Sequence, residues 1–424
     1  MKNRSTVAII GSGISGLTAA YILRQQYDVT LYEAAERLGG HTHTHTLTDS
    51  AGGTHAIDSG FVIHNIRTYP LLLRLFRELD VATEPTEMSL SVSCRGCGLE
   101  FTGGRGYRGV FAMPTAPFRL RYLKLLLTIK PFFKDIKKFL ATPGNDHITL
   151  GEFLRAGHYG LYFETHFILP IVSGVWSCEF DEARQYPARY LFQYMDNHGM
   201  LQPDNLKGNK DWRVVVDGSN AYVKKIAPLL HKVVRDAAVT KLERTDGAFR
   251  VTDSTGATAT FDKVVVATHP DQALKLLAHP TAREREILGA FRYRDLAVQL
   301  HTDTSVLPRH KRASGSWNYV IPHCMNSHSG IRFSYDMNHI KQLTSPDHYI
   351  VSLDSATLID PAKIIKTLHY QHPLFTLESV AAQAKLASLN SESLAFAGAY
   401  HGWGFHEDGC RSGVAAAAAL GVHW

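Results

Sequence analysis

Short apolar runs, separated by longer stretches of mixed polarity, are the most regular feature of the chain. Four of these runs have the length and the apolar content of buried strands: residues 7–10, 28–32, 263–267 and 394–397. We interpret all four as parallel strands of one sheet. Because the last two are far from the first two in the sequence, the sheet is expected to be assembled from separated segments, with other material inserted between them.

A glycine-rich turn follows the first of these runs and precedes a helix expected over residues 14–25. Its sequence is Gly11-Ser12-Gly13-Ile14-Ser15-Gly16. In a turn of this kind Gly11 closes the bend, Gly13 lets a pyrophosphate approach bare backbone, and Gly16 lets helix and strand pack closely. Backbone amides at the start of the helix, that of Ser15 included, would then face the diphosphate with the favourable end of the helix dipole.

An acidic residue follows the second strand at the distance that dinucleotide recognition requires. Glu33 comes directly after residues 28–32, where its carboxylate can accept hydrogen bonds from both ribose hydroxyls of an adenosine. The strand before the glycines, the helix after them and this acid supply the context that confirms the motif. The sequence therefore predicts a dinucleotide site.

The residues after Glu33 indicate which dinucleotide is bound. The segment Glu33-Ala-Ala-Glu-Arg37-Leu-Gly39-Gly40 resembles the extended fingerprint of glutathione-reductase-type flavoproteins, especially the amine oxidase and phytoene desaturase branch. The resemblance implies that Arg37 and the paired glycines lie against the diphosphate of FAD. It also implies that His41 contacts the flavin and that the backbone of Val239 meets the adenine. The predicted cofactor is FAD.

The C-terminal region carries a second signal of the same kind. Flavoproteins of the amine oxidase type end in a strand, a glycine turn and a helix, and residues 394–419 are similar to that pattern. The resemblance implies that Gly398, Glu407, Asp408 and Gly409 lie beside the flavin pyrimidine ring, where backbone amides stabilise negative charge. Since two carboxylates would oppose an anionic flavin, we expect the side chains of Glu407 and Asp408 to cap the helix or to point aside.

Several further motifs are similar to a narrower group. They are His55-Ala-Ile-Asp58-Ser-Gly60-Phe61-Val62-Ile-His64-Asn65, the stretches 68–70, 88–93 and 174–177, Leu300-His301, and the Gly-Phe-His-Glu-Asp-Gly sequence at 404–409. The chain resembles, over essentially its whole length, the flavin domain that precedes plant cyclopropane fatty acid synthases and its free-standing bacterial NAD/FAD-binding relatives. The resemblance implies an FAD-dependent oxidoreductase that moves a hydride from a lipid acyl group to flavin N5. It also implies that residues 60–62 pass the isoalloxazine.

The expected fold is α/β, with a glutathione-reductase-type FAD-binding Rossmann domain and an inserted, mixed α+β substrate lobe. We assign residues 1–65, 206–280 and 391–424 to the FAD-binding domain, and residues 66–205 and 281–390 to the substrate lobe. A chain of 424 residues is too long for a single core, which agrees with two lobes.

Candidates for a catalytic base or orienting group are His64, Tyr400 and His406, with Tyr69 and Glu407 as further choices. The strand expected around residues 296–303 resembles the one that, in amine oxidases of this superfamily, carries a lysine beside the flavin. That stretch contains no lysine, and Arg294 is the nearest cation. This absence argues against an amine substrate. Two alternatives remain: an amine oxidase acting on a small amine, and a non-catalytic flavoprotein that assists a lipid-methylating synthase.

Charge and composition add a prediction about location. Residues 105–138 contain nine lysines and arginines but a single acid, Asp135, and these charges alternate with leucines and aromatics. Pro131 is expected to divide this stretch into two helices. The segment 105–140 could lie in a membrane interface, or it could be a substrate-lobe helix with a solvated basic face. We expect a cytoplasmic protein that contacts the inner face of a membrane peripherally and does not bind nucleic acid.

Two groups of potential metal ligands are visible in the sequence. His41, His43 and His45 alternate, so a strand would place them on one face. Cys94 and Cys97 have dithiol spacing, but no second Cys-x-x-Cys motif accompanies them. Five cysteines in a chain of this length do not indicate a disulfide framework. From the sequence we therefore predict no metal site.

Overall fold

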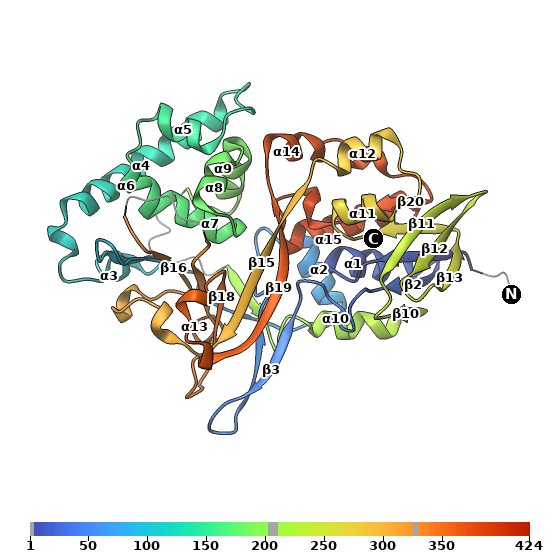
Figure 1. The fold of residues 1–424 in the computed structure, drawn as a ribbon, viewed down its shortest axis with the longest axis horizontal. Helices are drawn as coiled ribbons and strands as arrows, with labels where there is room; N and C mark the ends of the chain where they lie inside the picture. The colour runs from blue at the N-terminus through green and yellow to red at the C-terminus, as the bar shows by residue number, and fades with distance from the viewer. Residues whose placement is uncertain (1–3, 202–210, 325–329) are drawn as a thin grey trace.

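The computed structural model describes residues 4–201, 211–324 and 330–424. The expected domain boundary between residues 205 and 206 lies outside these ranges. A five-stranded parallel sheet forms one half of the molecule (Figure 1). Its strands, in spatial order, are β10 (Lys232–Val234), β2 (Asp28–Tyr32), β1 (Thr6–Ile10), β14 (Lys263–Val266) and β20 (Leu394–Phe396). The four strands predicted from the apolar runs are all present, and each pairs in parallel with its neighbours.

Strand β1 shows why these runs are apolar at every position. Val7 and Ile9 face one hydrophobic core, whereas Ala8 and Ile10 face another on the opposite side of the sheet. Both faces are therefore covered, which is typical of a parallel sheet. One cover consists of α1 (Ile14–Leu23), α2 (Pro70–Glu78), α10 (Ala221–Ile226) and α15 (His406–Ala419). The other includes β11 (Val239–Thr245), β12 (Ala248–Asp253), β13 (Thr258–Phe261), α11 (Pro270–Leu276) and α12 (Ala282–Leu288).

The two helices that flank the glycine turn pack very closely. A Cβ atom on Gly413 of α15 would lie 2.4 Å from the carbonyl oxygen of Ser15 in α1, and one on Gly16 would lie 2.0 Å from that of Gly11. Neither distance is sterically allowed, so both contacts require glycine. All ten residues of α1 are buried. The turn between β1 and α1 is therefore held rigidly from two sides.

A seven-stranded mixed sheet dominates the other half of the molecule. Its strands, in spatial order, are β19 (Ile364–Leu374), β15 (Arg292–His301), β18 (Ile350–Leu353), β17 (Phe333–Asp336), β16 (Trp317–Ile321), β7 (Leu90–Cys94) and β8 (Glu100–Gly103). The pairing of β16 with β7 is parallel and the other pairs are antiparallel. The long β15–β19 ribbon runs between the two halves (Figure 1). The fold is thus the expected α/β flavoprotein architecture with an additional α+β lobe.

Helices of the second half gather beyond this sheet (Figure 1). They are α3 (Gly106–Val110), α4 (Leu120–Ala141), α5 (Leu150–Ala156), α6 (Leu161–Phe163), the π-helical turn η2 (Glu164–Ile168), α7 (Leu169–Trp176), α8 (Phe180–Gln185) and α9 (Ala188–Asn197). The prediction that Pro131 divides the basic stretch in two is wrong, because α4 continues through this proline. Pro131 costs one amide hydrogen bond, but Tyr122 and Leu125 before it and Phe132 and Ile136 after it are buried in the same core.

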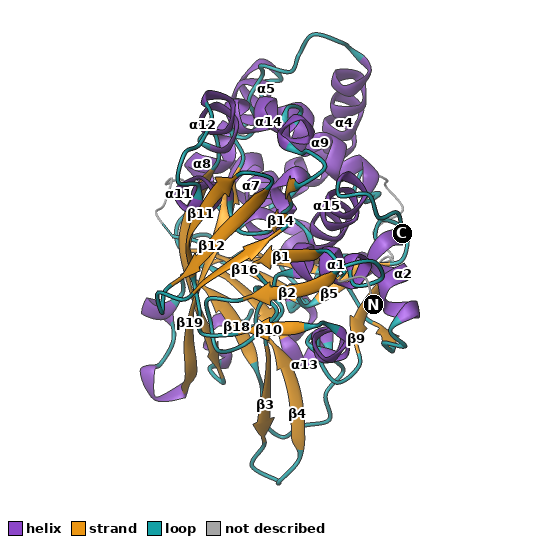
Figure 2. Cartoon of the chain, turned by 90° about the vertical axis from the view of Figure 1, so that its right-hand side faces the viewer, coloured by secondary structure: helices purple, strands orange, loops and turns teal. Residues whose placement is uncertain are grey.

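Two smaller sheets complete the chain. The hairpin β3 (Thr44–Thr48) and β4 (Thr54–Asp58) projects from the body of the molecule (Figure 2). The strands β5 (Ile63–Asn65) and β6 (Thr83–Pro85) both pair with β9 (Trp212–Val215). Of the three alternating histidines, His41 and His43 precede β3 and only His45 belongs to it, and the rings of His43 and His45 lie 4.1 Å apart. Among the described residues, no helix combines the length and the apolar character needed to cross a bilayer.

Candidate functional site

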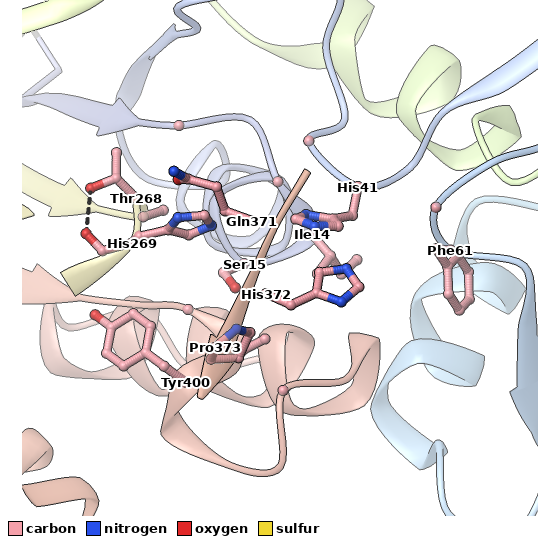
Figure 3. Close-up of a pocket in the computed structure, with 18 of the residues that line it drawn as sticks. Ile14, Ser15, His41, Phe61, Thr268, His269, Gln371, His372, Pro373 and Tyr400 are labelled. Atoms are coloured by element: carbon pink, nitrogen blue, oxygen red, sulfur yellow. Dashed lines mark hydrogen bonds between the residues drawn. The ribbon is translucent and has the colours of Figure 1, made fainter. Parts of the chain in front are cut away.

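A cavity of 710 Å³ lies where the two halves of the molecule meet. Most of the residues assigned to FAD from the sequence line it: Gly11, Ser12, Gly13, Ile14, Ser15, Glu33, Gly39, Gly40, His41, Gly60, Phe61, Val62, Val239 and Gly398. Two of the three candidate catalytic residues, Tyr400 and His406, line it as well. Figure 3 shows how side chains from distant segments converge on this space. We refer to it below as the central cavity.

The glycine turn at one end of the cavity has the geometry that a pyrophosphate requires. Gly11 has a φ of +103°, and a Cβ there would lie 2.7 Å from the carbonyl oxygen of Ala267. Gly13 is the N-cap of α1 and has no side-chain cap, and a Cβ there would meet nothing within 4 Å. Gly40 lies close to this turn, because a Cβ atom on Gly40 would lie 3.2 Å from the Cα of Gly13. Bare backbone at a helix N-terminus thus faces the cavity, as anion binding requires.

Glu33 connects the end of β2 to this turn. One carboxylate oxygen accepts hydrogen bonds from the backbone amide of Ser12 at 3.0 Å and from its hydroxyl at 2.5 Å, and the other accepts from the amide of Ala35 at 3.0 Å. The Ser12 hydroxyl accepts in turn from the amide of Gly39 at 3.0 Å. Each carboxylate oxygen has lone pairs left over. Glu33 can therefore accept from ribose hydroxyls while it fixes the loop.

Another part of the cavity wall is formed by His41, residues 60–63 and the start of α15. The two loops touch, because a Cβ on Gly60 would lie 2.0 Å from the carbonyl oxygen of His41, which also accepts from the amide of Phe61 at 2.8 Å. The ring of His406 stacks on Phe61 at 3.6 Å between centroids. His406 Nε2 lies 3.0 Å from the Thr42 hydroxyl. These contacts give a flat, closely packed surface.

Three histidines from separate segments turn toward the middle of the cavity (Figure 3). The ring of His41 lies 5.3 Å from that of His372 on β19 and 6.5 Å from that of His269, the N-cap of α11. Burial lowers the pKa of His41 and of His269, and lowers that of His372 to about 4. The same cause lowers the pKa of His406 to about 3. At neutral pH these imidazoles are uncharged hydrogen-bonding groups.

Buried polar atoms beside the cavity show that it suits a ligand rich in hydrogen-bonding groups. His41 Nε2, His269 Nδ1 and the Tyr400 hydroxyl are buried without a hydrogen-bond partner among the described protein groups. Buried polar atoms are nearly always paired, so these atoms are expected to meet a ligand or water. Together with the glycine turn and Glu33, they fit a dinucleotide.

Five residues assigned to FAD do not line the cavity: Gly16, Arg37, Glu407, Asp408 and Gly409. Gly16 permits the close packing of α1 described above. Arg37 donates to the carbonyl oxygen of Thr42 at 3.3 Å. Gly409 permits the contact between helices, since a Cβ there would lie 2.6 Å from the Ile14 side chain. These residues do not face the cavity, but they support the segments that line it.

The two carboxylates at the start of α15 are engaged elsewhere. Glu407 accepts from the backbone amides of Leu71 and Leu72 at 3.1 and 2.9 Å, at the start of α2, and burial raises its pKa. Asp408 accepts from the amide of Phe405 at 3.0 Å and pairs with Arg411, and burial raises its pKa to about 6. Both side chains therefore cap helices and point aside, as their acidity led us to expect. Glu407 is not available as a base.

His64 is also placed away from the cavity, and we withdraw it as a candidate base. Its ring is completely buried and lies 5.5 Å from Phe76, 6.4 Å from Phe61 and 6.5 Å from Tyr69. Neither ring nitrogen has a hydrogen-bond partner among the described groups. Burial, reinforced by the charge of Arg213, lowers the pKa of His64 to about 4. The alternation of β5 explains the placement, because Ile63 lines the cavity and the next side chain points the other way.

We predict that His64→Leu retains FAD and activity and makes the protein more resistant to acid. In the unfolded chain this histidine takes up a proton near its ordinary pKa of roughly 6.5, whereas in the folded protein it does so only near pH 4. His64 therefore lowers the stability of the wild type increasingly as the pH falls from 6.5 to 4. The stabilisation of the variant, measured as the difference in Tm from wild type, should be larger at pH 5 than at pH 7.5.

The control for this prediction is His231→Leu, at an exposed position. It should leave the pH dependence of Tm as in the wild type. Loss of turnover in His64→Leu with FAD still bound would restore His64 as a catalytic candidate.

Several lining residues were not identified from the sequence. They are the aromatic side chains Tyr293, Trp317 and Tyr335, with His269, His372 and Pro373. His269 follows the strand at 263–267 directly, so its place after a parallel strand was a usable signal. The others lie in the mixed sheet, where the sequence gives no indication of which strand faces the cofactor domain. Trp176, Trp403 and Phe405 also line the cavity.

No lysine or arginine of residues 4–201, 211–324 and 330–424 lines the cavity beside its tryptophans. Arg294 is held by ion pairs to Glu179, Glu182 and Asp354 at 2.7, 2.9 and 3.4 Å. Among the lining residues that the structure describes, Lys275 on α11 is the only lysine or arginine.

The fold and the cavity define an FAD-dependent oxidoreductase. The chain belongs to the family of flavin-containing amine oxidoreductases, which matches residues 14–329. FAD is accordingly its cofactor, and Gly13, Glu33 and His41 are among the cavity-lining residues that could hold it. No curated protein sequence matches the chain.

Solved structures with the same fold cover nearly the whole chain. A CLA-producing fatty acid isomerase from P. acnes superposes with a TM-score of 0.70 at 16% identity, over 96% of this chain and 97% of that one. Cyclohexylamine oxidase from Brevibacterium oxydans IH-35A gives a TM-score of 0.68 at 17% identity, over 98% of each chain. Putrescine oxidase gives 0.68 at 14% identity, over 98% of each. At these identities the likeness concerns the fold alone.

Proposed function

We propose that the protein oxidises the acyl chain of a lipid. The observation that carries the proposal is the uncharged, aromatic end of the central cavity, where Trp176, Trp317, Tyr335, Trp403 and Phe405 form the wall. A hydrocarbon chain gains free energy from burial against such a wall, and Glu33, at the glycine turn, is the only acidic residue among the described residues that line the cavity. The P. acnes neighbour is named a fatty acid isomerase, so this architecture is compatible with an acyl substrate.

The protonation states around the cavity support a neutral substrate. His41 and His406 are neutral at physiological pH, and burial raises the pKa of Tyr400, which keeps its phenol protonated. The walls are dry enough to shift all three groups in the direction that removes charge. FAD, when bound, supplies the two-electron acceptor. The residues of the chain hold the acyl carbon in place, exclude water and offer only neutral hydrogen bonds.

His406 is the best-placed group for an orienting role. Its Nε2 lies 3.0 Å from the Thr42 hydroxyl, and this hydroxyl lies 2.6 Å from that of Tyr222. The hydrogen bonds from Tyr222 through Thr42 to His406 fix the imidazole against Phe61 and determine which of its nitrogens faces the cavity. Tyr400 is the second candidate, because its buried hydroxyl lacks a partner. We propose both residues, rather than His64, as the side chains that orient the reacting groups.

The proposal is tested by analysis of products from the flavin-loaded enzyme incubated with phospholipids that carry unsaturated, cyclopropane or methyl-branched chains. Dehydrogenation removes two hydrogen atoms from the chain, whereas isomerisation leaves its mass unchanged. We expect the lighter product with wild type and its loss in Trp317→Glu, which places a charge in the aromatic wall. Retention of FAD by this variant shows that the fold is intact.

Other outcomes would replace the proposal. Oxidation of a small amine, with no change in any lipid, would indicate an amine oxidase. Absence of turnover with either panel, combined with normal lipid methylation in cells that carry Trp317→Glu, would indicate an accessory role beside a lipid-methylating synthase.

We further propose that the segment 105–140 contacts an anionic membrane surface. Four of the large apolar side chains most exposed in the structure belong to it: Tyr107 (76%), Phe118 (83%), Leu120 (82%) and Leu127 (77%). Leu120 and Leu127 of α4 are seven residues apart and flank the exposed Lys124, so they lie on one side of the helix. Apolar anchors surrounded by lysine and arginine are typical of an interfacial helix.

Replacement of both leucines by aspartate (L120D/L127D) is expected to weaken binding to vesicles that contain anionic phospholipid by at least tenfold. The change removes two apolar contacts and adds two repelling charges, and each charge near an anionic surface is worth about 1 kcal/mol. Vesicle co-sedimentation measures the effect. Wild type should bind less in high salt and less to purely zwitterionic vesicles.

Leu229→Asp is the matched control, since Leu229 is also exposed but lies near α10 in the other half of the molecule. Equal binding of wild type and L120D/L127D would show that α4 merely presents a solvated basic face.

A further inference from the structure

Three cysteines and a histidine meet at one point in the mixed α+β half of the molecule. Cys94 is the last residue of β7, Cys97 lies in the turn toward β8, His166 is in η2, and Cys324 follows β16. Their ligand atoms all lie within 4.8 Å of one another. The Sγ atoms of Cys94 and Cys324 are 3.5 Å apart, and Cys97 Sγ is 3.6 Å from His166 Nε2. None of the four lines the central cavity.

These separations correspond to the edges of a metal-centred tetrahedron. With Zn–S bonds of about 2.3 Å and Zn–N bonds of about 2.0 Å, tetrahedral angles place two sulfur ligands roughly 3.8 Å apart and a sulfur and a nitrogen roughly 3.5 Å apart. A disulfide would require about 2.05 Å between sulfurs. The Cys94–Cys324 distance is far longer, and all four atoms converge without a bond between any pair.

The contacts around His166 are compatible with the tautomer that a metal needs. His166 Nδ1 lies 3.0 Å from the carbonyl oxygen of Tyr162, which can only accept, and 2.9 Å from the Thr165 hydroxyl, which can accept as well, so both contacts fit a proton on Nδ1. This leaves the lone pair of Nε2 directed at the cysteines. A ring nitrogen that donates to a backbone carbonyl while the other faces the metal is the usual outer-shell arrangement of metal-bound histidines.

The loop that carries Cys94 and Cys97 is held in shape from several sides. The Cys94 carbonyl oxygen accepts from the amide of Gly98 at 2.8 Å, and Gly98 has a φ of +66°. Arg119 donates to the carbonyl oxygen of Cys97 at 2.7 Å. A Cβ on Gly96 would lie 3.0 Å from the backbone nitrogen of Cys324, so this close approach depends on glycine. The ligands are therefore positioned by the fold before any metal binds.

We propose that Cys94, Cys97, His166 and Cys324 bind one zinc ion in a closed, structural site. Thiolate and imidazole ligands in tetrahedral array favour zinc over calcium or magnesium, and four protein ligands leave no open position for catalysis. Binding requires the thiolates, so the thiol protons are released to solvent as the bonds to zinc form. No electron transfer is involved.

The ion would join three segments that are distant in sequence. Cys94 and Cys97 hold the β7–β8 turn, His166 holds the helical stretch that leads into α7, and Cys324 holds the end of β16. Trp176 at the end of α7 and Trp317 at the start of β16 belong to the aromatic wall of the central cavity. The zinc site therefore braces that wall from a distance. Its loss is expected to lower Tm and to loosen substrate binding more than FAD binding.

The metal content of the purified, flavin-loaded wild-type protein is the first test. After dialysis under reducing conditions, elemental analysis should find one zinc per chain. Replacement of zinc by Co²⁺ should give d–d bands in the red, beyond the absorption of oxidised flavin, with the intensity of tetrahedral thiolate coordination. No zinc in protein from zinc-supplemented cells, with no such cobalt spectrum, would overturn the proposal. Stoichiometric iron in its place would overturn the assignment to zinc.

Variants supply the second test. Cys97→Ser and His166→Ala should retain less than a tenth of the wild-type zinc after dialysis, whereas His166→Cys, which restores four ligands, should retain it. Cys178→Ser is the matched control, because Cys178 is a buried cysteine of the same half but lies outside the cluster. FAD content reports folding in each case. Full zinc in both Cys97→Ser and His166→Ala would overturn the proposed ligand set.

Discussion

Gly13→Ala is expected to fold normally and to lose most of its affinity for FAD. At this position φ is −63° and ψ is 173°, which alanine adopts without strain, and the added methyl group meets no protein atom within 4 Å. The methyl group instead enters the central cavity at the N-terminus of α1, where the diphosphate must touch backbone. Steric overlap of this size costs about 1–3 kcal/mol, which corresponds to a loss of roughly 5- to 150-fold in affinity.

The affinity is measured by titrating the apoprotein with FAD. Binding is monitored through the quenching of flavin fluorescence. Gly160→Ala is a closely matched control, because Gly160 is also the extended N-cap of a helix, with φ −74° and ψ 151°, and its Cβ would likewise meet nothing within 4 Å. The two variants should share the Tm of the wild-type apoprotein, and only Gly13→Ala should lose flavin. Equal FAD affinities would show that the diphosphate does not pass Gly13.

Lys341→Met is expected to destabilise the protein by about 3–5 kcal/mol, the cost of leaving one member of a buried ion pair without its partner. The ammonium of Lys341 lies 3.1 Å from the carboxylate of Asp58, and both side chains are almost completely buried. Asp58 also accepts from the hydroxyl of Thr44 at 2.6 Å and from the amide and hydroxyl of Ser219 at 2.8 Å. These neutral donors would remain, but the charge would be uncompensated.

Denaturant unfolding of the flavin-free protein measures this effect. The double variant D58N/K341M removes both charges and should recover part of the lost stability. Lys385→Met breaks an ion pair whose two side chains are exposed, so it should produce no measurable change. Because Asp58 leads directly into Gly60 and Phe61, Lys341→Met should also weaken FAD binding. A stability equal to wild type would show that the pair of Lys341 and Asp58 does not stabilise the folded protein.

The sequence predicted the cofactor half of the molecule in detail because local chemistry determines it. Apolar runs, glycines at fixed offsets and one acid at the end of a strand define the β1–α1–β2 unit, and each requirement involves neighbours in the sequence. The capping of helices by Glu407 and Asp408 could also be anticipated, because their charge is incompatible with a site for an anionic flavin. The apolar character of four runs also indicated parallel strands of one sheet, but their order in the sheet and the fifth strand, β10, were not predicted.

Features that depend on long-range packing could not be predicted in the same way. His64 follows the flavin loop in sequence, but the alternation of a three-residue strand turns it away from the cavity. Pro131 is a helix breaker in isolation, yet burial on both sides of it keeps α4 continuous. The ligand cluster joins Cys94 to Cys324 across 230 positions and Cys97 to His166 across 69. No local motif connects residues at such separations.

The proposed roles of the aromatic wall and of the basic helix are both consistent with a lipid substrate. Segment 105–140 would hold the enzyme against an anionic surface, and Arg119 at the start of α4 contacts the loop of the proposed zinc site. The proposed site would in turn brace the elements that carry Trp176 and Trp317. In this arrangement the charges that would attract the membrane are on the outside, and the surfaces that would meet the acyl chain are neutral. We therefore expect a preference for acyl chains over amines.

Anaerobic reduction of the purified flavoprotein by candidate substrates tests that preference most directly. We expect phospholipids with unsaturated, cyclopropane or methyl-branched chains to bleach the oxidised flavin band, amines to leave it unchanged, and the band to return when an electron acceptor is admitted. Bleaching by amines alone would overturn the proposed acyl substrate.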